Sequence, residues 1–179
     1  MAYTITTPPS EPITTAEAKT HLRVTHTDDD AYIDSLVTAA RGWIERQYDI
    51  AIGSQTITEY FDDWDVDQVR LSVGIVTSVT SLKYYDSDNA QQTLTTIKSD
   101  LASKKARIVV NSDVTTPVVY DRPNAIEVIY VAGDTPSPVV HAMKLMISDW
   151  YVNRERMPGN VKGRIMDTVE RLLYPYAHV

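Results

Sequence analysis

Residues 28–48 read DDDAYIDSLVTAARGWIERQY, and this stretch predicts a long amphipathic helix. Its apolar residues recur every three to four positions, which places them on one helical face. They are Ile33, Leu36, Val37, Ala40, Ile44 and Tyr48. Thr27 is expected to cap the helix, so that the aspartates at 28–30 lie where the helix dipole favours negative charge. Such an apolar face has to be buried against other parts of the chain.

Further helices are predicted near both ends of the sequence. Thr14 and Glu17 have the spacing of a capping box, so a short helix should run from there to about Val24. Residues 1–12 contain three prolines and are expected to form an extended arm. Apolar stripes after residue 136 predict one helix that ends before Pro158 and a last helix that ends at Pro175.

The region between these helices changes to the composition of β-strands. Residues rich in Val, Ile, Thr and Tyr, bounded by Gly, Pro, Asn and Asp, predict strands over 56–61, 69–73, 76–85, 91–97, 107–110 and 125–131. A turn at 86–90 should join two of them as a hairpin. The block as a whole indicates a small antiparallel sheet or sandwich.

The predicted class is therefore α+β: a helical bundle from the N- and C-terminal helices, with an inserted small antiparallel β domain. We expect a single domain over residues 1–179, in which 1–50 form the arm and first helices. Residues 54–133 form the β insertion, and residues 136–179 form the last helices and a tail.

Composition excludes several classes of site. The chain has no cysteine, which excludes disulfides, thiolate metal sites and cysteine nucleophiles and fits assembly in a reducing cytoplasm. It has neither a signal-peptide pattern nor an apolar run near the roughly 20 residues of a membrane span. The net charge is −7, and residues 28–67 hold eleven acidic residues against two arginines. An acidic domain is a poor candidate for tight duplex binding; its surface either repels DNA, as a conduit wall should, or is simply solvated.

No motif for catalysis, a cofactor or a metal emerges. The aspartates at 62, 63, 65 and 67 resemble part of a calcium loop, but Gln68 and Gly74 stand where that loop needs Gly and Glu. His21 and His26 lie near the aspartates at 28–30 without metal-ligand spacing. Phosphate-binding glycine loops and nucleophile elbows are missing from the sequence. A basic cluster at Lys98, Lys104, Lys105 and Arg107 indicates a solvated loop.

Three segments carry a resemblance to a known family. They are PITTAEAKTHLRV (12–24) followed by DDDAYI (28–33) and AAR (39–41), then VTSVTSLKYYD (76–86) closing at QQTL (91–94), and PVVHAMK (138–144) through DWYVNRE (149–155). Together they resemble the head–tail connector, or adaptor, proteins of tailed bacteriophages. The stretch from Lys98 to Lys105 departs from that family and is expected to be a distinctive loop.

The resemblance implies a structural role in the virion. Members of the family form a ring in the neck, typically of twelve subunits, assembled in the host cytoplasm. The ring contacts the portal protein on one side and a stopper or tail-completion protein on the other. DNA passes through its lumen without sequence-specific binding, and no membrane, cofactor, metal or catalytic residue is implied.

Two groups of residues are candidates for contacts. The apolar tail is expected to dock into the portal or a neighbouring subunit, or else to pack on its own bundle; its residues are Arg171, Leu172, Leu173, Tyr174, Tyr176 and Val179. An acidic loop is expected to line the channel or face a partner, with Trp64 as an exposed contact; its residues are Asp62, Asp63, Trp64, Asp65 and Asp67.

Three other functions compete with the adaptor interpretation. A stopper or tail-completion protein would be dominated by β-structure, which the flanking helices disfavour. A small metal-dependent hydrolase would need ligands that converge near His26. A carbohydrate-binding module would need exposed aromatic residues on one face of the β block.

Overall fold

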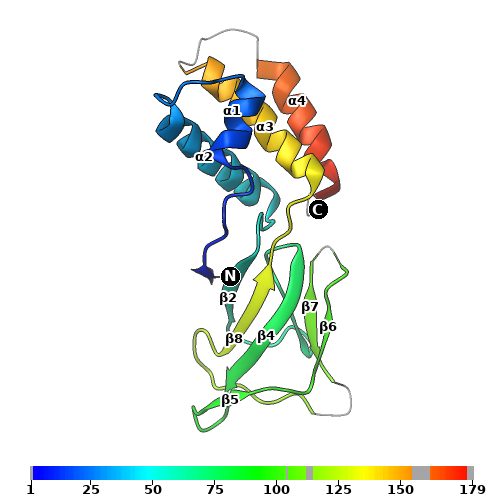
Figure 1. Cartoon of the computed structure of the whole chain (residues 1–179). Coiled ribbons are helices and arrows are strands. Elements are labelled where there is room, and N and C mark those ends of the chain that lie inside the picture. Colours follow the sequence, from blue (N-terminus) through cyan, green and yellow to red (C-terminus); the bar gives the residue numbers. More distant parts are fainter. Residues whose placement is uncertain (1, 104, 112–114, 155–161, 177–179) are drawn as a thin grey trace. The chain divides into compact units, whose positions relative to one another are not determined.

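The computed structural model describes residues 2–103, 105–111, 115–154 and 162–176. The chain divides into two compact units. The helical unit takes residues 10–53 and 135–176, and the β unit takes residues 2–9 and 54–134. The predicted α+β class is confirmed, because helices and antiparallel sheets both occur (Figure 1).

The helical unit joins helices from both ends of the sequence. It contains α1 (Thr15–Leu22), α2 (Asp30–Tyr48), α3 (Ser137–Val152) and α4 (Lys162–Leu173), followed by a 3-10 turn over Tyr174–Tyr176. Helix α3 contacts each of the other three helices. The predicted stripe of α2 is buried from Ile33 to Ile44, against a stripe of α3 that includes Val139, Met143 and Met146. Each such side chain contributes roughly 1.5–3 kcal/mol when it is fully buried.

The two N-terminal helices begin differently from each other. At α1 the predicted capping box is present: Glu17 N–H donates to Thr14 Oγ1, and Thr14 N–H donates to the Glu17 carboxylate at 2.8 Å. These bonds from Thr14 lower the pKa of Glu17. At α2 the predicted Thr27 cap is wrong, because the helix starts at Asp30 and Asp29 is the N-cap residue. Asp29 makes no capping bond, since its carboxylate accepts hydrogen bonds from α3 and the residues after it.

The β unit contains two antiparallel sheets. The five-stranded sheet has the order β1 (Ala2–Thr7), β2 (Gln55–Phe61), β8 (Ile126–Ala132), β4 (Val76–Tyr85), β5 (Gln91–Thr93). The three-stranded sheet has the order β3 (Gln68–Arg70), β7 (Arg107–Val110), β6 (Ile97–Asp100). Alternate residues of β8 are buried, as expected for strands that cover a core with one face.

Three predictions about this unit are wrong. The extended arm is instead the edge strand β1, which pairs with β2 from Ala2 to Thr7, since the first two prolines come only after it. The partner strand of the hairpin ends at Thr93 rather than at Ile97, because Ile97 already begins β6 of the other sheet. The expected loop from Lys98 is in part the strand β6, whose Asp100 accepts a bond from Arg107 of β7.

Candidate interaction surfaces

The C-terminal residues of the helical unit separate into buried and exposed side chains. Leu173 is fully buried, which anchors the end of α4, whereas the next residue, Tyr174, is 74% exposed. Leu172 and Tyr176 are half-buried and Arg171 is exposed. Val179 lies outside the described residues. Of the predicted docking residues, Tyr174 therefore offers the largest free apolar surface.

The predicted acidic loop, between β2 and β3, is held by contacts to two distant segments. Asp62 accepts a hydrogen bond from Asn124 N–H at 2.7 Å, and Asp67 accepts one from the Thr116 hydroxyl at 2.5 Å. Trp64 donates its indole N–H to the carbonyl of Pro117 at 2.9 Å and is half-buried, so it is not the exposed contact that was expected. The remaining aspartates, Asp63 and Asp65, stay exposed.

These aspartates do not converge on one point. Asp65 lies 3.6 Å from the Arg70 guanidinium, and Asp63 accepts from the N–H of Trp64. Within the described part of the chain, no group of three or more His, Asp or Glu side chains is placed to hold a metal ion. His26 lies 4.0 Å from Asp29, and both are in the helical unit.

Val66, in the same loop, was missed by sequence reasoning. It is 83% exposed and has a φ of 50°, and its neighbour Asp67 has a φ of 62°. A β-branched residue rarely adopts this left-handed conformation, which costs roughly 1–3 kcal/mol. Backbone hydrogen bonds between Asp65 and Gln68 close a two-residue turn around Val66 and Asp67, and turns of this kind place both central residues at positive φ. Such turns usually carry Asn, Asp or Gly, so a valine gave no sequence signal for the turn.

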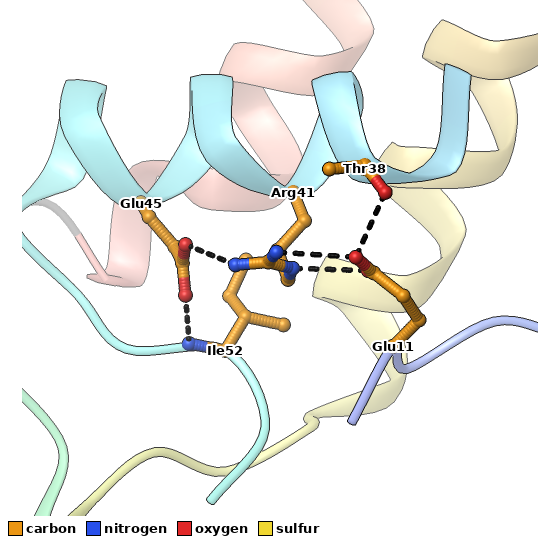
Figure 2. Close-up of polar contacts among 5 residues, drawn as sticks. All are labelled: Glu11, Thr38, Arg41, Glu45 and Ile52. Carbon is orange, nitrogen blue, oxygen red and sulfur yellow. Dashed lines mark hydrogen bonds and ion pairs between the residues drawn. The ribbon is translucent and has the colours of Figure 1, made fainter. Parts of the chain in front are cut away.

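A second feature missed from sequence is an ion-pair node on α2 (Figure 2). The Arg41 guanidinium donates through Nε and Nη2 to both carboxylate oxygens of Glu11, at 2.9 and 3.1 Å. It also donates through Nη1 to Glu45 at 2.7 Å, and the other oxygen of Glu45 accepts the N–H of Ile52 at 3.0 Å. The hydrogen bond with Glu11 is the main cause of the raised pKa of Arg41.

This node binds both ends of the first part of the helical unit, residues 10–53, through Glu11 and Ile52. Glu11 follows the boundary between residues 9 and 10, and Ile52 precedes the boundary between residues 53 and 54. Arg41 itself is only 16% exposed, so its charge is neutralised in a partly dry environment. The node therefore fixes both linkers on the helical side.

A third cluster joins the start of α2 to the end of α3. Asp29 accepts the Tyr151 hydroxyl at 2.6 Å and Arg154 Nη2 at 3.0 Å, through the same oxygen. Arg154 also lies over the rings of Tyr32 and Tyr151, at 4.6 and 5.1 Å from their centroids. The hydrogen bond from Tyr151 is the main cause that lowers the pKa of Asp29.

No helix among the described residues is long and apolar enough to cross a bilayer.

Chains from gene transfer agent (GTA) particles have a fold similar to that of this chain. A chain from the neck of an empty GTA particle with C6 symmetry has a TM-score of 0.79 and 21% identity, covering 100% of this chain and 96% of that one. A chain from the virion of the native particle has a TM-score of 0.81 and 19% identity, with coverages of 100% and 96%. A chain from the native neck with C12 symmetry has a TM-score of 0.78 and 21% identity, with the same coverages.

The family of the chain follows from its sequence. The model of the phage gp6-like head-tail connector proteins matches residues 12–109, which is more than half of the chain. The protein belongs to this family and is a structural protein of the phage neck. None of the curated proteins matches the chain.

Proposed function

We propose that this protein is the adaptor of the neck: copies of it form a closed ring between the portal and a stopper or tail-completion protein. The ring is a dodecamer in the virion, after assembly in the host cytoplasm, and DNA passes through its lumen without sequence-specific contacts. The whole chain acts as one connector domain with no enzymatic activity. The bundle of N- and C-terminal helices carries the β unit as an insertion.

The observation that carries this proposal is the family match over residues 12–109. The likeness of fold extends over the full chain, and two of the similar chains come from necks described with C6 and C12 symmetry. A ring of that symmetry uses heterologous contacts, in which two different surfaces of one subunit meet on neighbouring copies. The stopper alternative is disfavoured because about half of the chain is helical unit.

The C-terminal tail is proposed as the docking element toward the portal or the next subunit. Tyr174 supports this role, since a tyrosine that is 74% exposed beside half-buried apolar neighbours is typical of an interface anchor. Leu173, by contrast, holds α4 on its own unit. The proposed docking surface consists of Tyr174 with Arg171, Leu172 and Tyr176. Val179, which the sequence also predicts as a docking residue, lies outside the described residues.

The acidic loop is proposed as a wall of the DNA channel or as a partner surface. The carboxylates of Asp62, Asp63, Asp65 and Asp67 are exposed and all carry the same sign of charge. A negatively charged channel wall repels the DNA backbone and prevents DNA from adsorbing to it during ejection. The contacts from Asn124 and Thr116 support the role, because they hold the loop in one position.

The proposal is tested by electron microscopy of portal-containing heads, produced without this protein and then incubated with the purified chain. Added density in the form of a ring below the portal, with twelve-fold symmetry, is the expected result. Heads that bind no chain, or that bind it away from the portal vertex, would contradict the adaptor role. Metal analysis and glycan-binding assays on the same sample address the hydrolase and carbohydrate alternatives.

A further inference from the structure

The two sheets of the β unit differ in the length and charge of their edge strands. The edges of the three-stranded sheet are β3 and β6, which are short and carry charges at Arg70, Lys98 and Asp100. Charged side chains and short strands are the usual protection against unwanted strand pairing. By contrast, the two open edges of the five-stranded sheet, which are β1 and residues 76–81 of β4, contain no charged residue.

One unprotected edge is β1. Its six residues, AYTITT, contain no charge and no proline, and every residue from Tyr3 to Thr7 is exposed. One side of the strand pairs with β2, and no described strand pairs with the other side. A free row of backbone N–H and C=O groups of this length is a template for another strand.

The opposite edge of the sheet is open as well. The ten-residue strand β4 is covered on its outer side by β5 only at Lys83–Tyr85. Residues 76–81, VTSVTS, therefore have no ladder partner on that side among the described strands, and this segment also contains no charge. Two bulges at 76–78 and 79–81 bend this segment and increase its twist.

The buried face of the sheet continues onto β1. Ile5 is opposite Ile57 and Tyr3 is opposite Glu59, and both of these β2 residues are buried. Tyr3 and Ile5 nevertheless remain 49% and 46% exposed, and no described strand pairs with the outer side of β1. A further strand at this edge would complete the burial of two large apolar side chains.

We propose that β1 of one copy pairs with the outer edge of β4, residues 76–81, of the neighbouring copy, so that the five-stranded sheet continues from subunit to subunit. The occupant is a second copy because the two open edges lie on opposite sides of one sheet and match in length and lack of charge. Pairing of two different edges is heterologous and repeats around a closed ring, whereas β1–β1 pairing would stop at a dimer. This inference rests on the proposed adaptor ring.

The lack of cysteine allows a direct test in assembled necks. Two double variants, Thr4→Cys with Ser78→Cys and Thr4→Cys with Thr80→Cys, place thiols on the two edges and cover neighbouring registers. A short bismaleimide should convert assembled double variants into a ladder of covalent multimers on denaturing gels, and each single variant should stay monomeric. The control, Arg70→Cys with Ser99→Cys, places thiols on the two edges of the three-stranded sheet and should give no ladder.

Each other outcome has a defined meaning. Rings seen below the portal without a ladder from either double variant overturn the strand pairing and leave the adaptor role intact. Dimers from Thr4→Cys alone overturn it in favour of β1–β1 pairing, and an equal ladder from the control overturns its specificity. If the unaltered chain forms no ring on heads, the adaptor role itself fails.

A lysine at the edge provides a second measurement. Ile5→Lys should abolish ring assembly, because a charge would be buried in the new strand pair, while the free chain should still fold and unfold cooperatively. Ser99→Lys puts the same charge on the protected edge β6 and should assemble normally. Rings of normal occupancy with Ile5→Lys would overturn the inference.

Discussion

The Tyr130 hydroxyl donates a hydrogen bond to the Glu59 carboxylate at 2.9 Å, and both side chains are fully buried in the β unit. The other oxygen of Glu59 accepts the Ser72 hydroxyl at 2.6 Å. Burial and the neighbouring carboxylate raise the pKa of Tyr130 far above its ordinary value. The pair thus ties β2 to β8 and both strands to the segment before β4.

Tyr130→Phe should destabilise the β unit by about 1–3 kcal/mol, because one buried oxygen of Glu59 loses a donor. Urea denaturation followed by circular dichroism measures the change. Tyr120→Phe, at an exposed tyrosine of the same unit, should change stability by less than about 0.5 kcal/mol. Equal midpoints for the two variants would show that the hydroxyl of Tyr130 contributes nothing.

Arg41→Ala should destabilise the helical unit by about 1–3 kcal/mol, since Glu11 and Glu45 lose their shared cation in a partly buried site. Hydrogen exchange should also increase near residues 10–12 and 50–53, where the node holds the linkers. Arg46→Ala, at an exposed arginine of the same helix, is the control and should be nearly neutral. Unchanged exchange at both linkers in Arg41→Ala would contradict the clamp.

Asp29 should make the stability of the helical unit depend on pH. Its pKa is lowered from the ordinary 3.8, so the stabilisation is present above that value and is lost as the pH falls through the folded-state pKa. Asp29→Asn should therefore lower the thermal midpoint near pH 7, and the difference from the unaltered chain should shrink toward about pH 2.

Tyr151→Phe is the matched variant for this effect, because the Tyr151 hydroxyl is the largest cause of the lowered pKa. It should reduce the same pH dependence while keeping the aromatic ring beside Arg154. A difference between Asp29→Asn and the unaltered chain that is constant from acid to neutral pH would contradict a role for the ionised carboxylate.

The tail can be tested by separating packing from docking. Leu173→Ala should destabilise the free chain by about 2–5 kcal/mol, as for a buried leucine, whereas Tyr174→Ala should leave stability unchanged and weaken binding to portal-containing heads. Val118→Ala removes a similarly exposed apolar side chain from the β unit and is the binding control. Normal head binding by Tyr174→Ala and by a chain lacking residues 174–179 would remove the docking proposal.

Local patterns predicted the elements with good accuracy. The stripe from Ile33 to Ile44 is buried, the hairpin after Tyr85 is present, and β7 covers the predicted residues. The errors occur where a distant segment decides the outcome. Asp29 rather than Thr27 is the N-cap residue of α2, and its carboxylate accepts a hydrogen bond from Tyr151 of α3. The arm before Pro8 is a strand because it pairs with the edge of β2.

By itself the sequence determined the class of the fold, its helices, most of its strands and the connector family, because periodicity and capping depend on residues a few positions apart. Only the tertiary structure decided which polar groups meet and which edges stay open. Glu59 and Tyr130 are 71 residues apart, and Arg41 and Glu11 are 30 apart. No local pattern encodes such pairs, since each depends on how separate segments pack into one core.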